Sequence, residues 1–276
     1  MVTSMIYAPF PGEFIASALR RGKEILGIRC RQSDYQITKV SPRSSKDRWQ
    51  IVLPPVFQDD DIAKLALYEN TLYPLFSVMG RTVYYGNYTP NRNWRICFHC
   101  VEEDSETYGS PFIHVAHLTR SVTLCYKHAV RLAEKCPSCG AYIHSHDLAS
   151  IIDCSVYFPD VSNAAGSQHH DYAIFVNSLL DFRDSTYSQP WVNSTLSDKY
   201  IQVLHSGDHF TGYTSYRQEI GQFLGMHFNE TMSDYLSLDF CLALAFLGFR
   251  DAESLMSILK RPSEGPREPV IRAHPR

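Results

Sequence analysis

The sequence predicts a mainly α-helical fold in which a cysteine-rich, metal-binding module lies between two helical units. Apolar residues recur at helical spacing on both sides of this module, whereas six of the eight cysteines fall inside it, between Cys97 and Cys154. The module itself is dense in turn-forming residues and poor in helical periodicity. We therefore expect an N-terminal helical unit, the metal-binding module, a C-terminal helical unit and a loose tail at residues 1–92, 93–158, 159–260 and 261–276, respectively.

Composition limits the possible function classes. The 276 residues are 44% hydrophobic and 13% aromatic, which argues against long disordered stretches. The net charge of −3 argues against a protein that binds phosphate over much of its surface, so contacts to DNA would be local or shared with partners. We find no secretory signal pattern, and the longest apolar run, Phe240–Phe249, is about half a membrane span. We expect a bacterial cytoplasmic protein without a membrane segment, whose cysteines bind metal rather than form disulfides.

The N-terminal unit contains two predicted helices and a basic stretch. Apolar residues predict a helix over residues 12–26, and a second over 59–72 that Pro74 ends. Residues 20–48 carry nine lysines and arginines. This stretch could be an ordinary solvated surface or could face phosphate. The candidate nucleic-acid contacts are Arg20, Arg21, Lys23, Arg29 and Arg31.

The C-terminal unit is predicted to consist of helices joined by short loops. Apolar side chains at core spacing indicate helices over residues 170–182, 216–227, 233–249 and 251–259. A further helix is expected to start at Thr195 or Ser197, either of which can cap it, and to run towards His205.

The spacing of the cysteines is typical of zinc sites. Two thiolates, or a thiolate and an imidazole, that are separated by two residues can bind one ion from a tight turn, and two such pairs complete a tetrahedral site. The sequence contains three pairs and one further cysteine, in the order Cys97-x2-Cys100-x24-Cys125-x2-His128-x7-Cys136-x2-Cys139-x14-Cys154. We expect one zinc ion, with a second possible.

Two assignments of these ligands are compatible with the spacing. In the sequential assignment, which we favour because it completes one site by itself, the first ion is bound by Cys97, Cys100, Cys125 and His128. The second ion is then bound by Cys136, Cys139, Cys154 and one further group. In the interleaved assignment, the two C-x-x-C pairs share an ion and leave the other three ligands for the second.

The second site of the sequential assignment lacks one ligand. The position expected to pair with Cys154 is Tyr157, and tyrosine is a poor zinc ligand. Either His144 or His146 could supply the imidazole instead, or the site could be empty. We expect His99 to lie on the surface. His114 and His117 are expected to pack or to face a partner rather than bind metal.

The motifs of several zinc enzymes and nucleotide-binding proteins do not occur. There is no H-E-x-x-H, no deaminase signature, no phosphate-binding G-x-x-x-x-G-K-[ST] loop and no G-x-S-x-G. The acidic run Glu102–Glu106 is expected to be a solvated loop. A site with four protein ligands has no open position for substrate, so we expect structural zinc and no catalysis. A RING-like ubiquitin-ligase module has a related ligand order, but seven residues between His128 and Cys136 are too many for it.

Three stretches in order along the chain resemble those of a known family. They are Pro9–Ser17 (PFPGEFIAS), Tyr68–Phe76 (YENTLYPLF), and the cysteine-rich sequence with Cys97-Phe-His-Cys100, Pro111-Phe-Ile-His-Val-Ala-His117, Leu124-Cys-Tyr-Lys-His128 and Cys136-Pro-Ser-Cys-Gly140. Together they resemble the TniQ/TnsD family, the target-site selectors of cut-and-paste transposons. Two departures are Phe98, where the family usually has proline, and the halved last C-x-x-C pair.

The resemblance implies a zinc-ribbon module, a helix-turn-helix-like N-terminal unit and an adaptor function. Family members link a target-recognition device to an AAA+ ATPase regulator, which recruits the transposase. In CRISPR-associated transposons, TniQ proteins dock, often as dimers, on an RNA-guided Cascade effector, whereas TnsD proteins read attachment-site DNA directly. The net charge and moderate length favour the Cascade adaptor, and the basic stretch leaves the TnsD-type DNA reader as the alternative.

Overall fold

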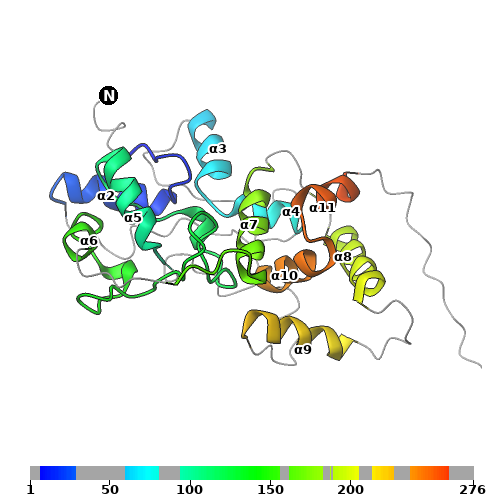
Figure 1. Ribbon diagram of the computed structural model, residues 1–276. Helices are drawn as coiled ribbons and strands as arrows, with labels where there is room; N and C mark the ends of the chain where they lie inside the picture. The colour runs from blue at the N-terminus through cyan, green and yellow to red at the C-terminus, as the bar shows by residue number, and fades with distance from the viewer. Residues whose placement is uncertain are drawn as a thin grey trace, which may run out of the picture.

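The computed structural model describes eight parts of the chain: residues 7–28, 60–80, 94–155, 162–182, 187, 189–204, 213–226 and 237–260. Figure 1 shows helices joined by loops, and within the described parts β-structure is limited to isolated bridges. The prediction of a mainly helical fold is confirmed. The predicted boundaries at residues 92 and 158, and the tail after residue 260, lie outside the described residues.

Three helices form one end of the molecule (Figure 1): α2 (Ile15–Ile25), α5 (Phe98–Tyr108) and α6 (Leu148–Ser155). Helix α6 packs against both α2 and α5. The first eight residues of α2 are all buried, the two arginines included, so this helix is surrounded by protein along most of its length.

Helices α5 and α6 were not predicted, because the module was expected to be made of turns. Helix α5 has only Phe98 and Val101 as ordinary apolar residues on its buried face, which Cys100 and Asp104 complete. A metal-ligating thiol and a paired carboxylate do not count as apolar in a periodicity search, so the pattern is hidden. The helix ends at Gly109, whose φ of 74° is the left-handed conformation that glycine adopts without strain.

The predicted helix over residues 59–72 is shorter, and Pro74 has the opposite role to the one expected. Helix α3 covers Asp60–Glu69, and a separate helix, α4, covers Tyr73–Val78. Pro74 lies in the first turn of α4, where no N–H partner is required, so it starts a helix rather than ending one.

The other end of the molecule is a bundle built around α10 (Leu238–Phe249). Every residue of α10 is buried, and its neighbours are α7 (Gln168–Leu180), α8 (Gln189–Leu204), α9 (Tyr213–Leu224) and α11 (Ala252–Leu259). A helix that is apolar on all sides belongs in such a central position. Helix α8 lies close to α10 at Gly248, where a Cβ would be in van der Waals contact with Lys199 Cγ at 3.4 Å. Helix α8 begins before the predicted Thr195, with Pro190 as its second residue.

The two ends share one continuous core. Helix α4 from the N-terminal part packs against α7 from the C-terminal part. Ser121 of the cysteine-rich module joins the bundle through two buried contacts: its hydroxyl lies 2.8 Å from the Tyr172 hydroxyl, and its N–H donates to Asp239 over 2.9 Å. The metal-binding region is therefore fixed to helices on both sides.

The three stretches that resemble the TniQ/TnsD family lie against one another. The side chain of Asn70 donates to the Glu13 carbonyl over 2.7 Å, and the Ile15 N–H donates to the Asn70 carbonyl over 2.9 Å. The Ser17 hydroxyl donates to the Glu13 carboxylate and accepts from the Ile113 N–H over 3.0 Å. Polar residues of these stretches thus hold α2, the α3–α4 turn and the segment before Val115 together.

None of the helices in the described part of the chain combines the length and the apolar character needed to cross a bilayer.

Candidate metal centres

Two groups of four potential ligands lie in the described part of the cysteine-rich module. The first cluster is Cys97, Cys100, Cys125 and His128; the second cluster is Cys136, Cys139, His146 and Cys154. In each, the four donor atoms lie within 4.8 Å of one another. This is the sequential grouping; the interleaved alternative does not occur.

The start of a helix presents two ligands of the first cluster. Cys97 immediately precedes α5, and Cys100 lies in its first turn. The other two ligands, Cys125 and His128, come from a tight turn that an antiparallel bridge closes. The first cluster therefore joins the end of a helix to a hairpin, and both parts depend on the same four donors.

The same backbone turn recurs in both clusters. The Ala129 N–H donates to the Cys125 carbonyl over 2.9 Å, and the Gly140 N–H donates to the Cys136 carbonyl over the same distance. The donor residue has a left-handed conformation in each case, with φ of 54° at Ala129 and 75° at Gly140. The two C-x-x-[C/H] pairs are therefore similar in the backbone conformation of the residue that follows each pair. Only the second turn has glycine, the residue that this conformation favours, at that position.

The distances in the first cluster fit a tetrahedral zinc ion. His128 Nδ1 lies 3.4 Å from Cys97 Sγ, 3.4 Å from Cys100 Sγ and 3.6 Å from Cys125 Sγ. The sulfur atoms of Cys100 and Cys125 are 3.7 Å apart. Zinc bonds of about 2.3 Å to sulfur and about 2.0 Å to nitrogen place neighbouring tetrahedral donors roughly 3.5–3.8 Å apart. The donor set thus has both the composition and the spacing that zinc requires.

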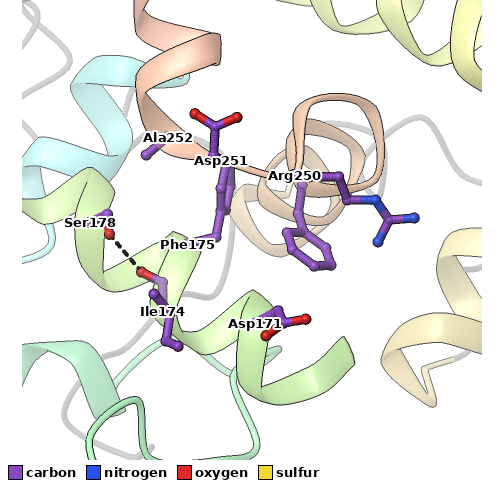
Figure 2. A pocket seen from close by; sticks show the side chains of 8 residues that line it. Asp171, Ile174, Phe175, Ser178, Arg250, Asp251 and Ala252 are labelled. Carbon is purple, nitrogen blue, oxygen red and sulfur yellow. Dashed lines mark hydrogen bonds between the residues drawn. The ribbon is translucent and has the colours of Figure 1, made fainter. Parts of the chain in front are cut away.

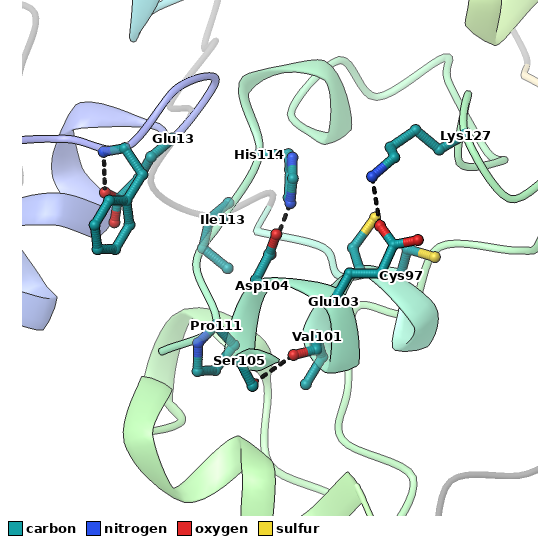
Figure 3. Close-up of polar contacts among 12 residues, drawn as sticks. Glu13, Cys97, Val101, Glu103, Asp104, Ser105, Pro111, Ile113, His114 and Lys127 are labelled. Carbon is teal, nitrogen blue, oxygen red and sulfur yellow. Dashed lines mark hydrogen bonds and ion pairs between the residues drawn. The ribbon is translucent and has the colours of Figure 1, made fainter. Parts of the chain in front are cut away.

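A carboxylate from α5 orients the imidazole of the first cluster. His128 Nε2 donates to Glu103 Oε1 over 2.8 Å, which leaves Nδ1 to face the three thiols. Glu103 also forms an ion pair with Lys127 (Figure 3), and Lys127 and His128 together lower the pKa of its carboxyl group. An ionised acceptor behind a ligating histidine fixes the ring and makes it a better donor to the metal.

Crowding of the three buried thiols perturbs their pKa values in opposite directions. Hydrogen bonds to Cys125 and Cys97, together with burial, raise the pKa of Cys100 far above its usual value. Hydrogen bonds from Cys100 and Cys97 lower the pKa of Cys125. Cys100 also hydrogen-bonds to Cys97 and lowers its pKa, but Cys125 and burial prevail and raise it to about 12. A divalent cation between them removes this competition, since it stabilises all three as thiolates.

The second cluster combines a turn, a short helix and α6. Cys136 and Cys139 come from the second tight turn, His146 directly follows a one-turn 3-10 helix, and Cys154 lies on α6. His146 is only 7% exposed. Its Nδ1 lies 2.8 Å from the Asp147 carbonyl, to which it donates, so Nε2 is left to face Cys154 Sγ at 3.5 Å.

His146, rather than His144, is therefore the candidate fourth ligand that the spacing of the cysteines left open. His144 is the middle residue of the 3-10 helix, half-buried, with its ring against Tyr142. Tyr157 lies outside the described residues.

Helix α2 positions the part of the chain that supplies His146 and Cys154. The Glu24 carboxylate accepts hydrogen bonds from the N–H groups of Leu148 and Ala149, at 3.0 and 3.3 Å, and so caps the start of α6. Arg20 donates to the His144 carbonyl over 2.7 Å. These contacts span about half the chain, so the second cluster depends on residues far away in the sequence.

Arg20 and Arg21 were predicted as nucleic-acid contacts, but both side chains are used inside the protein. Each residue is 5% exposed. Arg20 pairs with Glu24 at 2.9 Å, and Arg21 pairs with the fully buried Glu13 at 2.9 Å. Both guanidinium groups are buried and paired with a carboxylate, so neither is available to phosphate. Lys23 is half-buried. Arg29 and Arg31 lie outside the described residues.

The acidic run Glu102–Glu106 was expected to be a solvated loop; Glu102, Glu103 and Glu106 are exposed as expected, but Asp104 is buried and the run is helical rather than a loop. The run lies on α5 and contributes two functional contacts. Besides Glu103 behind His128, the Asp104 carboxylate is buried and lies 2.8 Å from His114 Nε2 (Figure 3). The signal that could have found Glu103 is its placement three residues after Cys100, on the same helix as two ligands.

The remaining histidines of the module are not part of either cluster. His99 lies on the surface, with its side chain 50% exposed, as expected. His114 packs against Phe112 and pairs with Asp104. His117 is 1% exposed, and burial lowers its pKa to about 4, with only partial opposition from Cys125. His117 is therefore a neutral packing residue at pH 7.

A pocket of about 280 Å³ lies away from the metal centres, between α7 and the turn that joins α10 to α11 (Figure 2). Its lining is partly apolar and partly charged: Asp171, Ile174, Phe175, Ser178, Phe246, Arg250, Asp251 and Ala252. The Ser178 hydroxyl donates to the Ile174 carbonyl over 2.9 Å, and Asp251 caps α11. These polar groups have structural roles, and the lining contains no pairing of a nucleophile with a base.

Comparison with known proteins gives no assignment: no family model, no curated protein and no solved structure matches this chain.

Proposed function

We propose that both clusters bind structural zinc and that the chain is a non-catalytic adaptor of the TniQ/TnsD type. In this function it links a target-recognition complex, an RNA-guided Cascade effector, to the AAA+ ATPase regulator of a transposon. The observation that carries the proposal is the pair of four-donor Cys₃His clusters, each of which joins a tight turn to a helix.

The donor sets support a structural function for the metal. Four protein donors fill the coordination sphere of a tetrahedral zinc ion, so no position is left for water or substrate. The histidines have their second ring nitrogen occupied, by Glu103 in the first cluster and by the Asp147 carbonyl in the second. Neither ring can therefore also serve as a general base. Zinc supplies charge neutralisation of the thiolates and fixes the ends of α5 and α6.

The packing of the resembling stretches supports the family proposal. Glu13, Ser17 and Asn70 belong to those stretches, and each one bonds to another of them or to the segment at Ile113. Glu13 and Ser17 are residues that the first stretch shares with the family, and residues shared for reasons of fold should make such contacts. The three stretches occur in the same order along the chain as in the family, and they contact one another in space. These two observations support the same proposal independently.

The placement of the arginines favours docking on a protein complex over direct DNA reading. Two of the five candidate nucleic-acid contacts, Arg20 and Arg21, pair inside the protein with the partly buried Glu24 and the fully buried Glu13. The net charge of −3 also gives no general attraction to phosphate. A TnsD-type reader would have to rely on other residues.

Reconstitution tests the proposal. The full chain, tagged, is mixed with the AAA+ regulator and with the Cascade effector of a CRISPR-associated transposon, and complexes are measured by size-exclusion chromatography with light scattering. We expect a complex with each partner and RNA-guided DNA insertion that depends on this chain. The matched negative control is the same mixture without the chain.

A DNA-binding measurement decides between the branches. Fluorescence anisotropy with attachment-site DNA and with scrambled DNA is recorded from low to physiological salt. Tight binding by the isolated chain that persists at physiological salt and prefers one sequence would replace the adaptor with the TnsD-type reader. Auto-ubiquitination in the presence of an E2 enzyme would instead support the RING-like alternative.

A further inference from the structure

The two clusters differ in how far their thiols are exposed. In the first cluster Cys97, Cys100 and Cys125 are at most 2% exposed. In the second cluster Cys136 is 1% exposed, but Cys139 lies on the surface and Cys154 is partly exposed. A reagent in solution can therefore reach a sulfur atom in the second cluster without any movement of the protein, whereas the sulfurs of the first cluster are covered.

We propose that Cys139 is a site of oxidation by peroxides, and that its oxidation joins it to Cys136 in a disulfide and releases the ion from the second cluster only. The inference rests on the proposed zinc occupancy, because a bound ion keeps both sulfurs as thiolates, the form that reacts. The modification affects the Cys136–Cys139 turn of the second cluster and leaves the Cys125–His128 turn of the first cluster unchanged.

The backbone around Cys139 favours the partner that we assign. Cys136 and Cys139 lie on one tight turn, which the Gly140 N–H closes by donating to the Cys136 carbonyl over 2.9 Å. The Cys136 N–H donates to the Ala141 carbonyl over 2.8 Å, so the turn keeps its shape from its own hydrogen bonds. Cys154, the other thiol of the second cluster, lies on a different element, α6.

The reaction has two steps. The Cys139 thiolate attacks one oxygen of hydrogen peroxide, the O–O bond breaks, and a sulfenic acid and a hydroxide ion form. The Cys136 thiolate then attacks the oxidised sulfur, displaces a second hydroxide ion and forms the S–S bond. Two electrons pass from the two sulfurs to the peroxide. Only His146 and Cys154 then remain as donors, which are too few to hold the ion.

The change is expected to be local and reversible. Glu24 caps α6 through the Leu148 N–H at 3.0 Å, and Arg20 holds the His144 carbonyl at 2.7 Å. Both contacts persist when the turn at Cys136 is oxidised. A thiol reductant together with zinc should therefore restore the second cluster without refolding of the chain.

The test uses the full chain loaded with zinc, in a Cys30→Ser background, because Cys30 lies outside the described residues. Hydrogen peroxide is added in steps, released zinc is followed with a chromophoric chelator, and disulfides are mapped by mass spectrometry. We expect one of the two bound ions to be released first, together with a Cys136–Cys139 disulfide, and dithiothreitol with zinc chloride to reverse both changes.

A labelling measurement on the unoxidised protein gives a second readout that needs no site variant. Alkylation with N-ethylmaleimide should modify Cys139 before any of the buried thiols of the first cluster.

Two variants test the zinc-release measurement. The variant Cys139→Ser should bind a single ion and lose the early phase of zinc release, while Cys125→Ser should keep this early phase.

Several outcomes would overturn the inference. Release of both ions at one rate, a disulfide at other cysteines, or first labelling at Cys97 would refute it and leave the proposed zinc sites standing. A chain that carries one zinc ion when purified, with Cys136 and Cys139 as free thiols, would refute the second zinc site and the inference together.

Discussion

Glu103 Oε1 lies 2.8 Å from Nε2 of His128, on the side of the imidazole ring away from the three thiols. The carboxylate is on α5, the same helix whose start supplies Cys97 and Cys100. The residue that precedes this helix and a residue in its first turn are therefore two of the candidate ligands, and a third residue of the helix orients the imidazole of another.

Removal of this carboxylate should weaken metal binding at the first cluster. We expect Glu103→Ala to lower zinc affinity there by about 10–100-fold, the usual cost of losing the partner of a ligating histidine. Competition with a chelator of known affinity measures the effect. Glu106→Ala, on the exposed face of the same helix, is the matched control and should leave the affinity unchanged.

Zinc affinity of the first cluster should rise steeply with pH. Because the pKa values of Cys97 and Cys100 are raised, both thiols are protonated at pH 7 before binding, whereas their hydrogen bonds lower the pKa of Cys125. Binding then releases about two protons, and the affinity should grow by about 100-fold per pH unit. Calorimetry in buffers of different ionisation enthalpy, with Cys136→Ser/Cys139→Ser to isolate the first cluster, counts the protons. A pH-independent affinity would contradict the coupled-thiol arrangement.

The two tight turns should respond in opposite directions to exchange of alanine and glycine. Ala129 has a left-handed φ of 54°, so Ala129→Gly should raise the free energy of unfolding by up to about 1 kcal/mol. Gly140→Ala should lower it by roughly 1 kcal/mol, and through backbone strain alone, since a Cβ there meets nothing within 4 Å. Denaturant unfolding in excess zinc measures both. Equal signs for the two variants would show that the turns are not equivalent.

Loss of Arg21 should destabilise the protein rather than weaken nucleic-acid binding. Its partner Glu13 is fully buried, and removal of one member of a buried ion pair costs about 3–5 kcal/mol. We therefore expect Arg21→Ala to lower the free energy of unfolding by about that amount, as measured with urea. Arg120→Ala, which removes a charge from an exposed residue, is the control. Unchanged stability with lost DNA affinity would restore the nucleic-acid function of Arg21.

Removal of the metal should unfold the module before the C-terminal bundle. In residues 94–155, the first cluster holds the start of α5 and the second cluster holds the end of α6. Helix α10, in contrast, is buried among four helices and has no cluster residue. Hydrogen exchange followed by mass spectrometry, with and without a chelator, should show early loss of protection in the module and retained protection in α10. Simultaneous loss in both regions would indicate a single cooperative unit.

The sequence alone was sufficient to predict which four residues form the first cluster, because two-residue spacing places two donors on one turn whatever surrounds it. It was not sufficient to choose between His144 and His146. That choice depends on the 3-10 helix Ile143–Ser145, which places one ring against Tyr142 and buries the other. Local spacing cannot show which side of a short helix faces a ligand.

The basic stretch shows a second limit. Arg20, Arg21 and Lys23 were predicted to form a charged surface, because a sequence does not show that the start of this helix is enclosed by protein or that Glu13 is brought to Arg21. Long polar side chains on a helix are exposed in most proteins, so the exception could only be found from tertiary contacts.

The cap that Glu24 provides for α6 sets a practical limit on how the chain can be divided. Many zinc-binding segments fold as excised peptides, because the ion replaces a hydrophobic core. Here a peptide of residues 94–155 would lack the carboxylate at the start of α6, the guanidinium that holds the His144 carbonyl, and the Ser17 hydroxyl that accepts from Ile113. The module is consequently not expected to fold when it is excised and placed in another protein. A fusion that uses it should include α2 as well.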